Sequence, residues 1–321
     1  MIIDVHVHLT MSGFTRGKFL KANAAMAAYL YNRIHGTNIS PDEHIASLKE
    51  RVDPDGTQLL AIMDQAGVNK SVIFGVDWAY GRTGEPRISN KEQNRIHANL
   101  ANKHPDRFIA LAALDPRRPD ALELAKEFIE DWNMTGFKLH PCAGFFPDDK
   151  AFYPFYKMCS DWKVPILFHS GGLEGNWVTA QPGHIATVAE HFPDIKVIMG
   201  HAGMESWQSA AAAAAFLPNV YLDISIIGQW RYCRNPEKFY RWLRDLIDEV
   251  GPWKVLFASD RPLPVSWISD VDWVKAVNEP QTDIPFSREE LDIIMGRAAA
   301  AVFLSRARSP AEAAHALPLR S

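Results

Sequence analysis

Short apolar runs recur along the chain and alternate with segments that have the composition and period of helices. The runs are rich in β-branched residues and are apolar almost throughout, which is typical of parallel strands that are buried on both faces. We predict eight such strands, at residues 2–7, 70–75, 108–114, 136–140, 164–169, 195–200, 220–224 and 255–259.

Helical segments fill the intervals between these strands, at residues 90–103, 119–131, 152–162, 183–191, 205–216, 236–250 and 288–304. Eight strand–helix units close naturally into a (β/α)8 TIM barrel of the α/β class, whose active site lies at the carboxyl ends of the strands. An open doubly wound sheet is the alternative. No Gly-x-Gly-x-x-Gly motif follows any of the strands, which argues against a dinucleotide-binding sheet.

A helical insertion separates the first two strands. Its helices are predicted at residues 18–34 and 41–51, the second capped by Ser40, and a third helix at 55–65 leads into the second strand. We expect residues 10–51 to cover the mouth of the barrel as a lid that brings Arg16 or Arg33 to the site. Residues 1–305 are predicted to form a single metal-dependent barrel domain, and 306–321 a loosely attached C-terminal tail.

Composition narrows the class of protein further. The chain has 321 residues, is 47% hydrophobic and 22% charged, and carries a formal charge of −4 without a long run of one sign. These values predict no nucleic-acid or membrane partner, and leave a small-molecule substrate and a homo-oligomer open. No apolar stretch is long enough for a membrane span, and three unpatterned cysteines predict reduced thiols in a cytoplasmic protein.

Polar residues interrupt the first strand at alternate positions. Asp4, His6 and His8 alternate with apolar residues, so His6 and His8 share one face of the strand. Two imidazoles one strand-step apart can hold one metal ion. Two exposed histidines on an edge strand are the other interpretation of this pair alone.

Later strands end in ionisable groups in the same way. His140 ends the fourth strand, His169 the fifth and His201 the sixth, and Asp260 follows the eighth. The carboxyl ends of barrel strands meet at one mouth, so these groups are expected to converge with His6 and His8. Histidines with one carboxylate make a plausible catalytic metal site that keeps a position open for water.

This arrangement resembles the amidohydrolase superfamily, and most closely the amidohydrolase-related branch that includes aminocarboxymuconate-semialdehyde decarboxylase. The resemblance extends over essentially the whole chain and rests on five motifs: Asp4-Val5-His6-Val7-His8, Lys138-Leu139-His140-Pro141, Phe168-His169-Ser170-Gly171, Gly200-His201-Ala202-Gly203 and Ala258-Ser259-Asp260. It implies that His6, His8, His169 and Asp260 bind one divalent metal ion, most often Zn²⁺, with Mn²⁺ as the alternative. It also implies that His201 stands beside the metal as an acid/base or oxyanion partner.

Two features of the chain depart from the family pattern or leave it ambiguous. Binuclear relatives carry a carboxylated lysine on the fourth strand, where this chain has Lys138, but the branch resembled is mostly mononuclear. We therefore interpret Lys138 as a structural or substrate-facing cation. The last helix contains Gly296-Arg297-Ala298-Ala299 and lacks the usual Asn of an Asn-Ala-Ala run.

Aromatic and basic residues in the loops after the strands suggest how a substrate is bound. The candidate substrate-binding residues are Lys138, His140, Trp78, Trp177, Trp230 and Arg261, with Trp267, Arg82 and Arg231 in the same loops. Arginine can hold a carboxylate bidentately, so a small aromatic or unsaturated acid is the expected substrate. Otherwise the tryptophans pack the loops on the barrel rim, and His140 orders the turn at Pro141.

The predicted activity is that of a metal-dependent hydrolase acting on a lactone, ester, amide or activated C–C bond. Metal-activated water would be the nucleophile, with Asp260 as general base and then general acid and His201 stabilising the oxyanion. A metal-dependent non-oxidative decarboxylase acting on a similar acid is the alternative. A barrel that only binds ligands is a remote third interpretation, because all the expected ligand residues are present.

Overall fold

A computed structural model describes residues 1–9, 17–49, 53–81, 84, 87–172 and 176–304. It contains one eight-stranded sheet whose strands follow each other in chain order and pair in parallel. The strands are β1 Ile3–His8, β2 Lys70–Phe74, β3 Phe108–Ala113, β4 Gly136–Leu139, β5 Ile166–His169, β6 Val197–Gly200, β7 Val220–Asp223 and β8 Val255–Leu256.

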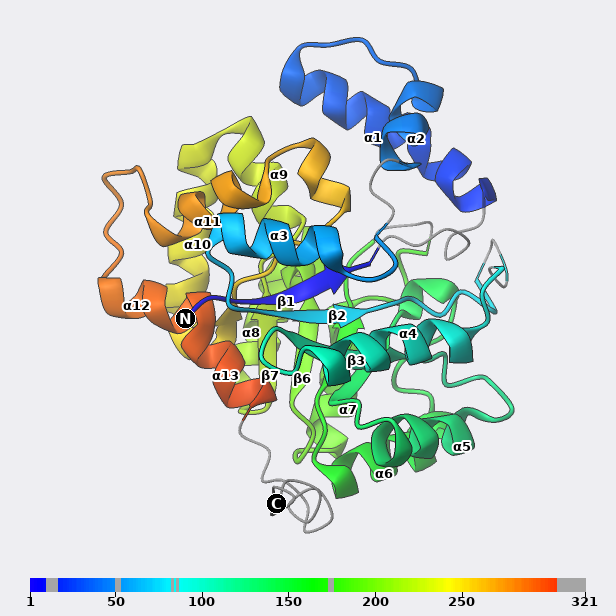
Figure 1. The fold of residues 1–321 in the computed structure, drawn as a ribbon. Coiled ribbons are helices and arrows are strands. Elements are labelled where there is room, and N and C mark those ends of the chain that lie inside the picture. Colours follow the sequence, from blue (N-terminus) through cyan, green and yellow to red (C-terminus); the bar gives the residue numbers. More distant parts are fainter. Residues whose placement is uncertain (10–16, 50–52, 82–83, 85–86, 173–175, 305–321) are drawn as a thin grey trace, which may run out of the picture.

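The first and last strands close the sheet into a barrel. The Val5 amide donates to the Phe257 carbonyl at 3.1 Å, the Asp260 amide to the His6 carbonyl at 2.8 Å, and the His8 amide to the Arg261 carbonyl at 2.8 Å. Helices surround the strands (Figure 1). The predicted (β/α)8 TIM barrel is therefore confirmed.

The helices occupy the predicted intervals, and further short helices follow β7 and β8. Their bounds are α1 Gly17–His35, α2 Pro41–Lys49, α3 Thr57–Ala66, α4 Asn90–Lys103, α5 Ala121–Lys126, α6 Tyr153–Trp162, α7 Pro182–His191, α8 Trp207–Phe216, α9 Ile227–Arg234, α10 Pro236–Val250, α11 Asp270–Asn278, α12 Arg288–Asp292 and α13 Ala298–Phe303. Shorter 3₁₀ turns lie at Pro141–Ala143, Lys150–Phe152, His201–Ser206, Pro252–Lys254 and Leu263–Ser266.

Two helices that the sequence predicts to be continuous contain a wider π-helical turn. These turns span Glu127–Asp131 after α5 and Ile293–Arg297 between α12 and α13. At Gly296 the second turn lies directly against the N-terminus, where an added Cβ would come within 2.1 Å of the Met1 carbonyl oxygen. A glycine is required there by this close approach of two backbones.

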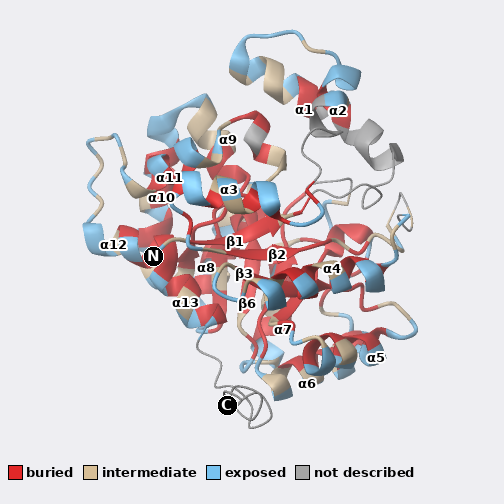
Figure 2. Ribbon diagram, in the orientation of Figure 1, coloured by how far each residue is buried: buried red, intermediate tan, exposed pale blue. Residues whose placement is uncertain are grey.

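Burial follows the layers of the barrel. The strands are buried almost throughout, whereas the helices expose their outer faces (Figure 2). Residues from strands on different sides of the barrel pack in one cluster, among them Val72, Leu111, Leu167, Ile198 and Leu256. This apolar packing leaves the carboxyl ends of the strands as the place where polar side chains gather.

The helices α1 and α2 lie between β1 and β2 in the chain, where the insertion is predicted, and stand away from the ring of barrel helices (Figure 1). Ser40 caps α2 as expected, because its Oγ accepts from the Glu43 amide at 3.2 Å. His35 Nε2 lies 2.6 Å from the Ser266 carbonyl oxygen, which ties α1 to the segment after β8. Arg16 and the tail 306–321 lie outside the described residues, and Arg33 donates to the Tyr29 hydroxyl at 3.4 Å.

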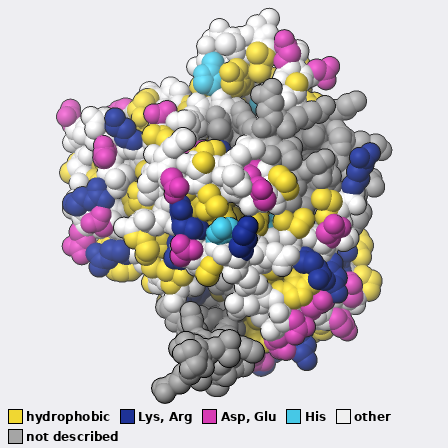
Figure 3. Space-filling model, in the orientation of Figure 1, with side chains coloured by type: hydrophobic (Ala, Val, Ile, Leu, Met, Phe, Trp, Pro, Cys, Tyr) yellow, Lys and Arg dark blue, Asp and Glu magenta, His cyan; other side chains and the backbone are white. Residues whose placement is uncertain are grey.

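The surface carries charges of both signs. On the face shown in Figure 3, acidic and basic side chains are interspersed rather than gathered into areas of one sign. None of the helices in the described ranges combines the length and the apolar character needed to cross a membrane.

Candidate metal centre and substrate pocket

Three predicted ligands meet where β1 lies beside the segment after β8. His6 Nε2 is 3.1 Å and His8 Nε2 is 3.2 Å from the same oxygen, Asp260 Oδ1. The donor atoms of all three residues lie within 4.8 Å of one another. The two histidines share a face of β1, and the backbone bond from the Asp260 amide to His6 holds the carboxylate opposite them. His8 is the most exposed of the three, at 24% of its side chain, so the group is open to solvent on the His8 side.

A second carboxylate orients His6 from behind. Asp223, the last residue of β7, is fully buried, and its Oδ2 lies 2.8 Å from His6 Nδ1. Its Oδ1 accepts from the His201 amide at 2.9 Å and from the Ser225 hydroxyl. A carboxylate on the far nitrogen fixes which nitrogen of a histidine faces a metal and raises its basicity. Sequence reasoning did not select Asp223, although the apolar run 220–222 ends in this acid just as other runs end in histidine.

The protonation states suit a metal site. Burial raises the pKa of Asp260, but His6 and His8 outweigh burial and hold that pKa well below its ordinary value. Burial lowers the pKa of His8 and keeps its imidazole neutral. Burial and Lys138 also lower the pKa of His6, but Asp223 and Asp260 together raise it above the ordinary value. The proton that these two carboxylates hold on His6 is the one that a divalent cation would displace.

His169 and His201 form a separate pair beside this group. His169 Nδ1 lies 3.1 Å from His201 Nε2, and His201 Nδ1 lies 2.8 Å from the Ser225 hydroxyl. His169 Nε2 is buried and has no hydrogen-bond partner among the described residues. The structure therefore brings together His6, His8 and Asp260 of the four predicted ligands, with His169 adjacent and one nitrogen still unpaired.

Backbone conformation at the site is unusual for residues with side chains. His201 has φ 59° and Asp260 has φ 52°, and Ile226, just after Ser225, has φ 57°. Residues other than glycine rarely adopt this left-handed region, and such residues cluster at functional sites. Here the residues with positive φ follow β6, β7 and β8, each of which supplies a polar group to the site.

The histidines after β4 and β5 are accompanied by a thiol. The ring centroids of His140 and His169 lie 4.3 Å apart. The donor atoms of His140, Cys142 and His169 lie within 4.8 Å of one another. Burial lowers the pKa of His140 and of His169 well below the ordinary value, so both rings are neutral. Trp78, a predicted substrate contact, packs against His140 at 4.5 Å between ring centroids.

Lys138 reaches the metal group from β4. Its ammonium Nζ lies 3.3 Å from His6 Nε2 and 5.0 Å from the centroid of the Phe74 ring, and the residue is 2% exposed. A buried cation beside the donor nitrogens is close enough to contact a bound group. Its assignment to substrate or to structure stays a prediction.

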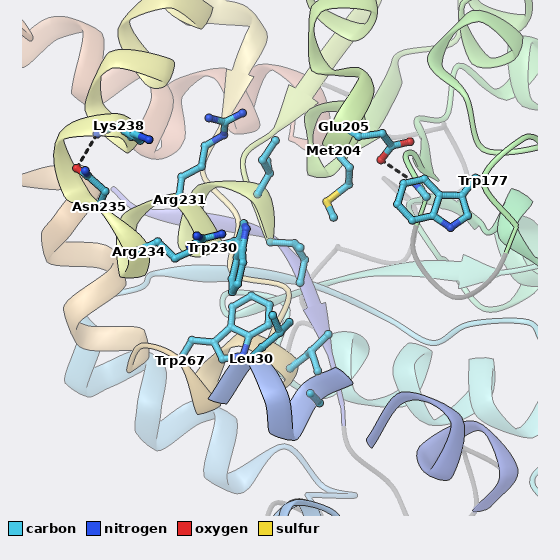
Figure 4. A pocket seen from close by; sticks show the side chains of 15 residues that line it. Leu30, Trp177, Met204, Glu205, Trp230, Arg231, Arg234, Asn235, Lys238 and Trp267 are labelled. Carbon is cyan, nitrogen blue, oxygen red and sulfur yellow. Dashed lines mark hydrogen bonds between the residues drawn. The ribbon is translucent and has the colours of Figure 1, made fainter. Parts of the chain in front are cut away.

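Residues that follow β5, β6, β7 and β8 in the chain line a cavity of about 650 Å³ (Figure 4). Trp177, Trp230 and Trp267 line it, and Ala27 and Leu30 of α1 form part of its wall. Two residues of the insertion therefore contribute to the wall of the cavity, and its role as a lid stays a prediction. Gly172 and Ile226, which also line the cavity, follow the site residues His169 and Ser225 closely in the chain.

Two other predicted contacts lie elsewhere. Arg261 directs its guanidinium to Asp270, with Nε 2.9 Å from Oδ2, and is not part of the wall of the cavity. Arg82 lies outside the described residues. Arg231, by contrast, lines the cavity together with Arg234 and Lys238, two cations that sequence reasoning did not single out.

Comparison with known protein families settles the relationship of the chain. The model of the amidohydrolase family matches residues 3–304, which is nearly the whole chain. The chain belongs to the amidohydrolase family. The predicted membership is confirmed, and with it the prediction that this chain is an enzyme of this family.

Solved structures with the same fold cover almost the whole chain. A TIM-barrel protein from Bordetella bronchiseptica matches with a TM-score of 0.70 and 20% identity, over 94% of this chain and 98% of the other. The 5-carboxyvanillate decarboxylase from Sphingomonas paucimobilis matches with a TM-score of 0.62 and 15% identity, over 94% and 98%. A dihydroxybenzoic acid decarboxylase from Polaromonas sp. JS666, with bound manganese and the inhibitor 2-nitroresorcinol, matches with a TM-score of 0.65 and 17% identity, over 95% and 98%.

Proposed function

We propose that this amidohydrolase is a metal-dependent, non-oxidative decarboxylase of a small aromatic carboxylic acid. The observation that carries the proposal is the convergence of His6, His8 and Asp260 in a barrel that matches aromatic-acid decarboxylases along its whole length. One of those decarboxylases holds manganese. These matches favour the decarboxylase alternative of the sequence analysis over the hydrolase that it preferred.

The residues that would hold the metal ion are His6, His8 and Asp260, with His169 as the fourth ligand. Two or three imidazoles and one carboxylate form a donor set suited to Zn²⁺ or Mn²⁺. The unpaired, buried Nε2 of His169 and the ionised Asp260 carboxylate support this fit. The chemistry that such an ion supplies is a fixed positive charge that orients and polarises the oxygens of the substrate.

Decarboxylation breaks the bond between a ring carbon and its carboxylate carbon, releases carbon dioxide and leaves an electron pair that needs a proton. Asp260 and His201 are the two groups we assign to that proton transfer. Asp260 Oδ1 lies 3.1 Å from His6 Nε2 and 3.2 Å from His8 Nε2. His201 is held by Ser225 on one nitrogen and faces His169 with the other. A positioned group of this kind contributes about 10²- to 10⁴-fold to the rate.

The tryptophan-lined cavity supports an aromatic substrate. Trp230 and Trp267 pack edge to face with ring centroids 6.0 Å apart, and Trp177 lies on another side of the same cavity (Figure 4). Indole rings bind flat conjugated ligands through stacking and edge contacts. The apolar wall that α1 adds would exclude water from the bound ring.

The test is to incubate manganese- and zinc-reconstituted protein with hydroxylated benzoic acids, such as 2,6-dihydroxybenzoate and 5-carboxyvanillate, and to measure carbon dioxide. In D2O the product should carry one deuterium on the carbon that lost the carboxylate, and Asp260→Asn should abolish both signals. Cleavage of esters, lactones or amides in a parallel panel, without carbon dioxide from any aromatic acid, would overturn the proposal and restore hydrolysis.

A further inference from the structure

The buried part of the cavity is apolar and borders the residues proposed for the site. The buried residues of its lining are Ala27, Gly172, Ile226, Ile227 and Trp267. Ile226 follows Ser225, whose hydroxyl lies 2.8 Å from His201 Nδ1. Gly172 is three residues after His169 in the chain. A ligand that extends from the site toward these residues therefore meets apolar side chains.

The polar residues of the lining lie at its solvent edge or are directed to other groups. Four of them are exposed: Glu205, Arg234, Asn235 and Lys238. The guanidinium carbon Cζ of Arg234 lies 4.9 Å from the centroid of the Trp230 ring (Figure 4). Arg231 is half-buried, and its Cζ lies 5.4 Å from the ring centroid of Trp242, which is outside the lining. The deeper part of the cavity is therefore mainly apolar.

The helix α1 of the insertion supplies one wall of this apolar space. Ala27 and Leu30 are three residues apart, so they share a face of α1, and both line the cavity. Further along α1, His35 Nε2 lies 2.6 Å from the carbonyl oxygen of Ser266, which directly precedes Trp267. This contact joins α1 to a segment that itself lines the cavity, so the two bound the same space.

The cavity is larger than a single aromatic ring requires. Its volume of about 650 Å³ falls within the range of about 300–1,000 Å³ that encloses drug-sized ligands. A benzoate ring is much smaller than such a ligand and would leave much of the apolar space unfilled. Apolar walls that contact no ligand atoms forfeit both dispersion energy and the removal of apolar surface from water.

We infer that the substrate is an aromatic acid that carries a second, apolar ring, and that Leu30 of α1 is a residue that selects it. The inference rests on the proposed function for the place of the carboxylate, at the metal centre. The second ring occupies the part of the cavity that Leu30, Trp230 and Trp267 line. The insertion thus determines specificity, because it supplies a wall that a substrate with a single ring does not need.

The experiment compares salicylate with 3-hydroxy-2-naphthoate, which is salicylate with one fused ring added, by calorimetric titration of the metal-loaded protein. We expect the naphthoate to bind about tenfold more tightly, the size expected when part of one added ring is buried. Leu30→Trp should reduce this preference to within about twofold, because the indole fills the space of the second ring. Leu30→Ala keeps the space open and removes only contacts, so it should reduce the preference by a smaller factor, about two- to threefold.

Ala25→Trp is the matched control, because Ala25 lies on the same helix but is exposed and outside the lining of the cavity. Its preference for the naphthoate should equal that of the wild type. Equal affinity of the wild type for the two acids, or an undiminished preference in folded Leu30→Trp, would overturn the inference. If Leu30→Trp does not fold, an undiminished preference in Leu30→Ala would overturn it instead.

Carbon dioxide is measured on the same samples, so that the two proposals are tested separately. A preference for the naphthoate without carbon dioxide from either acid would count against the proposed decarboxylation alone. Release of carbon dioxide without any preference would count against the second ring alone.

Discussion

Two histidine groups lie at the mouth of this barrel, and they differ in what accompanies them. On the β1 and β8 side, His6 and His8 meet the ionised carboxylate of Asp260, and Asp223 supports them from behind. On the β4 and β5 side, His140 and His169 meet a thiol, Cys142, and burial keeps both rings neutral.

The difference teaches which group is built for a cation. Buried carboxylates are costly unless a positive charge compensates them, and on the β1 side two of them face the same imidazole. The group on the β4 side, His140, Cys142 and His169, contains no carboxylate. We therefore expect the metal ion on the β1 side, with His169 of the other group as its fourth ligand.

Replacing the carboxylate at the centre of this comparison should have the largest effect. Asp260→Asn keeps an oxygen donor but removes the negative charge and the basicity, so turnover should fall about a thousandfold or more while some metal is retained. Steady-state kinetics with metal analysis of the same sample provides the measurement. Asp270→Asn is the control, since Asp270 pairs with Arg261 nearby and should leave metal content unchanged.

Replacing His201, which lies next to His169, should have the next largest effect on turnover. His201→Asn should lower turnover by about a hundredfold with nearly unchanged metal content, because His201 acts on the reacting group and not on the metal. Loss of metal from this variant would make His201 a primary ligand. Full activity would contradict the proton-transfer assignment.

Replacing Asp223, the carboxylate behind His6, should have a smaller but measurable effect on metal affinity. Asp223→Asn should weaken metal binding by about 10- to 100-fold, the usual effect of losing a carboxylate behind a histidine ligand. Cys142→Ser tests the other group and should leave metal affinity unchanged. If Cys142→Ser weakened binding more than Asp223→Asn in competition with a chelator, the two groups would have exchanged roles.

The smallest expected effect concerns a neutral histidine elsewhere in the barrel. Burial lowers the pKa of His97 to about 4, and its Nδ1 lies 2.8 Å from the Gln93 carbonyl oxygen. Between pH 6.5 and 4 the unfolded chain binds a proton at this residue that the folded chain does not. The free energy of unfolding should therefore fall as the pH falls through this range, by at most about 1.4 kcal/mol per pH unit from this group. Urea unfolding at several pH values should show a shallower acid dependence for His97→Gln.

The comparison also shows what the sequence could predict. Because His6 and His8 are two residues apart on an apolar strand, they must share one face of it. Because His169, His201 and Asp260 end or follow other apolar strands, they were expected at the same mouth of the barrel. The bounds of β2 were predicted to within one residue, because buried parallel strands have a strong apolar signal, whereas β8 is three residues shorter than predicted. The barrel followed from these local patterns, and so did the choice of the residues proposed for the site.

The remaining features depend on tertiary contacts that no local pattern encodes. Arg261 is next to Asp260 in the chain but turns to Asp270, an ion pair that depends on how α11 packs. The π-helical turn at Gly296 follows from its contact with the Met1 backbone. Asp223 was missed for a different reason: the signal was present at the end of the 220–222 run, but a single acid carries little weight until its distance to His6 is known.

The most direct test of the central claim is the metal content of the wild type and of the His6→Ala/His8→Ala double variant after reconstitution with Zn²⁺ or Mn²⁺. The wild type should bind about one equivalent, and the double variant essentially none while its circular dichroism stays that of a folded barrel. His184→Ala is the control, because His184 pairs with Asp148 outside the site at 2.9 Å and should leave the metal content unchanged. A double variant that keeps its metal, or a wild type that binds none, would contradict a metal centre on β1.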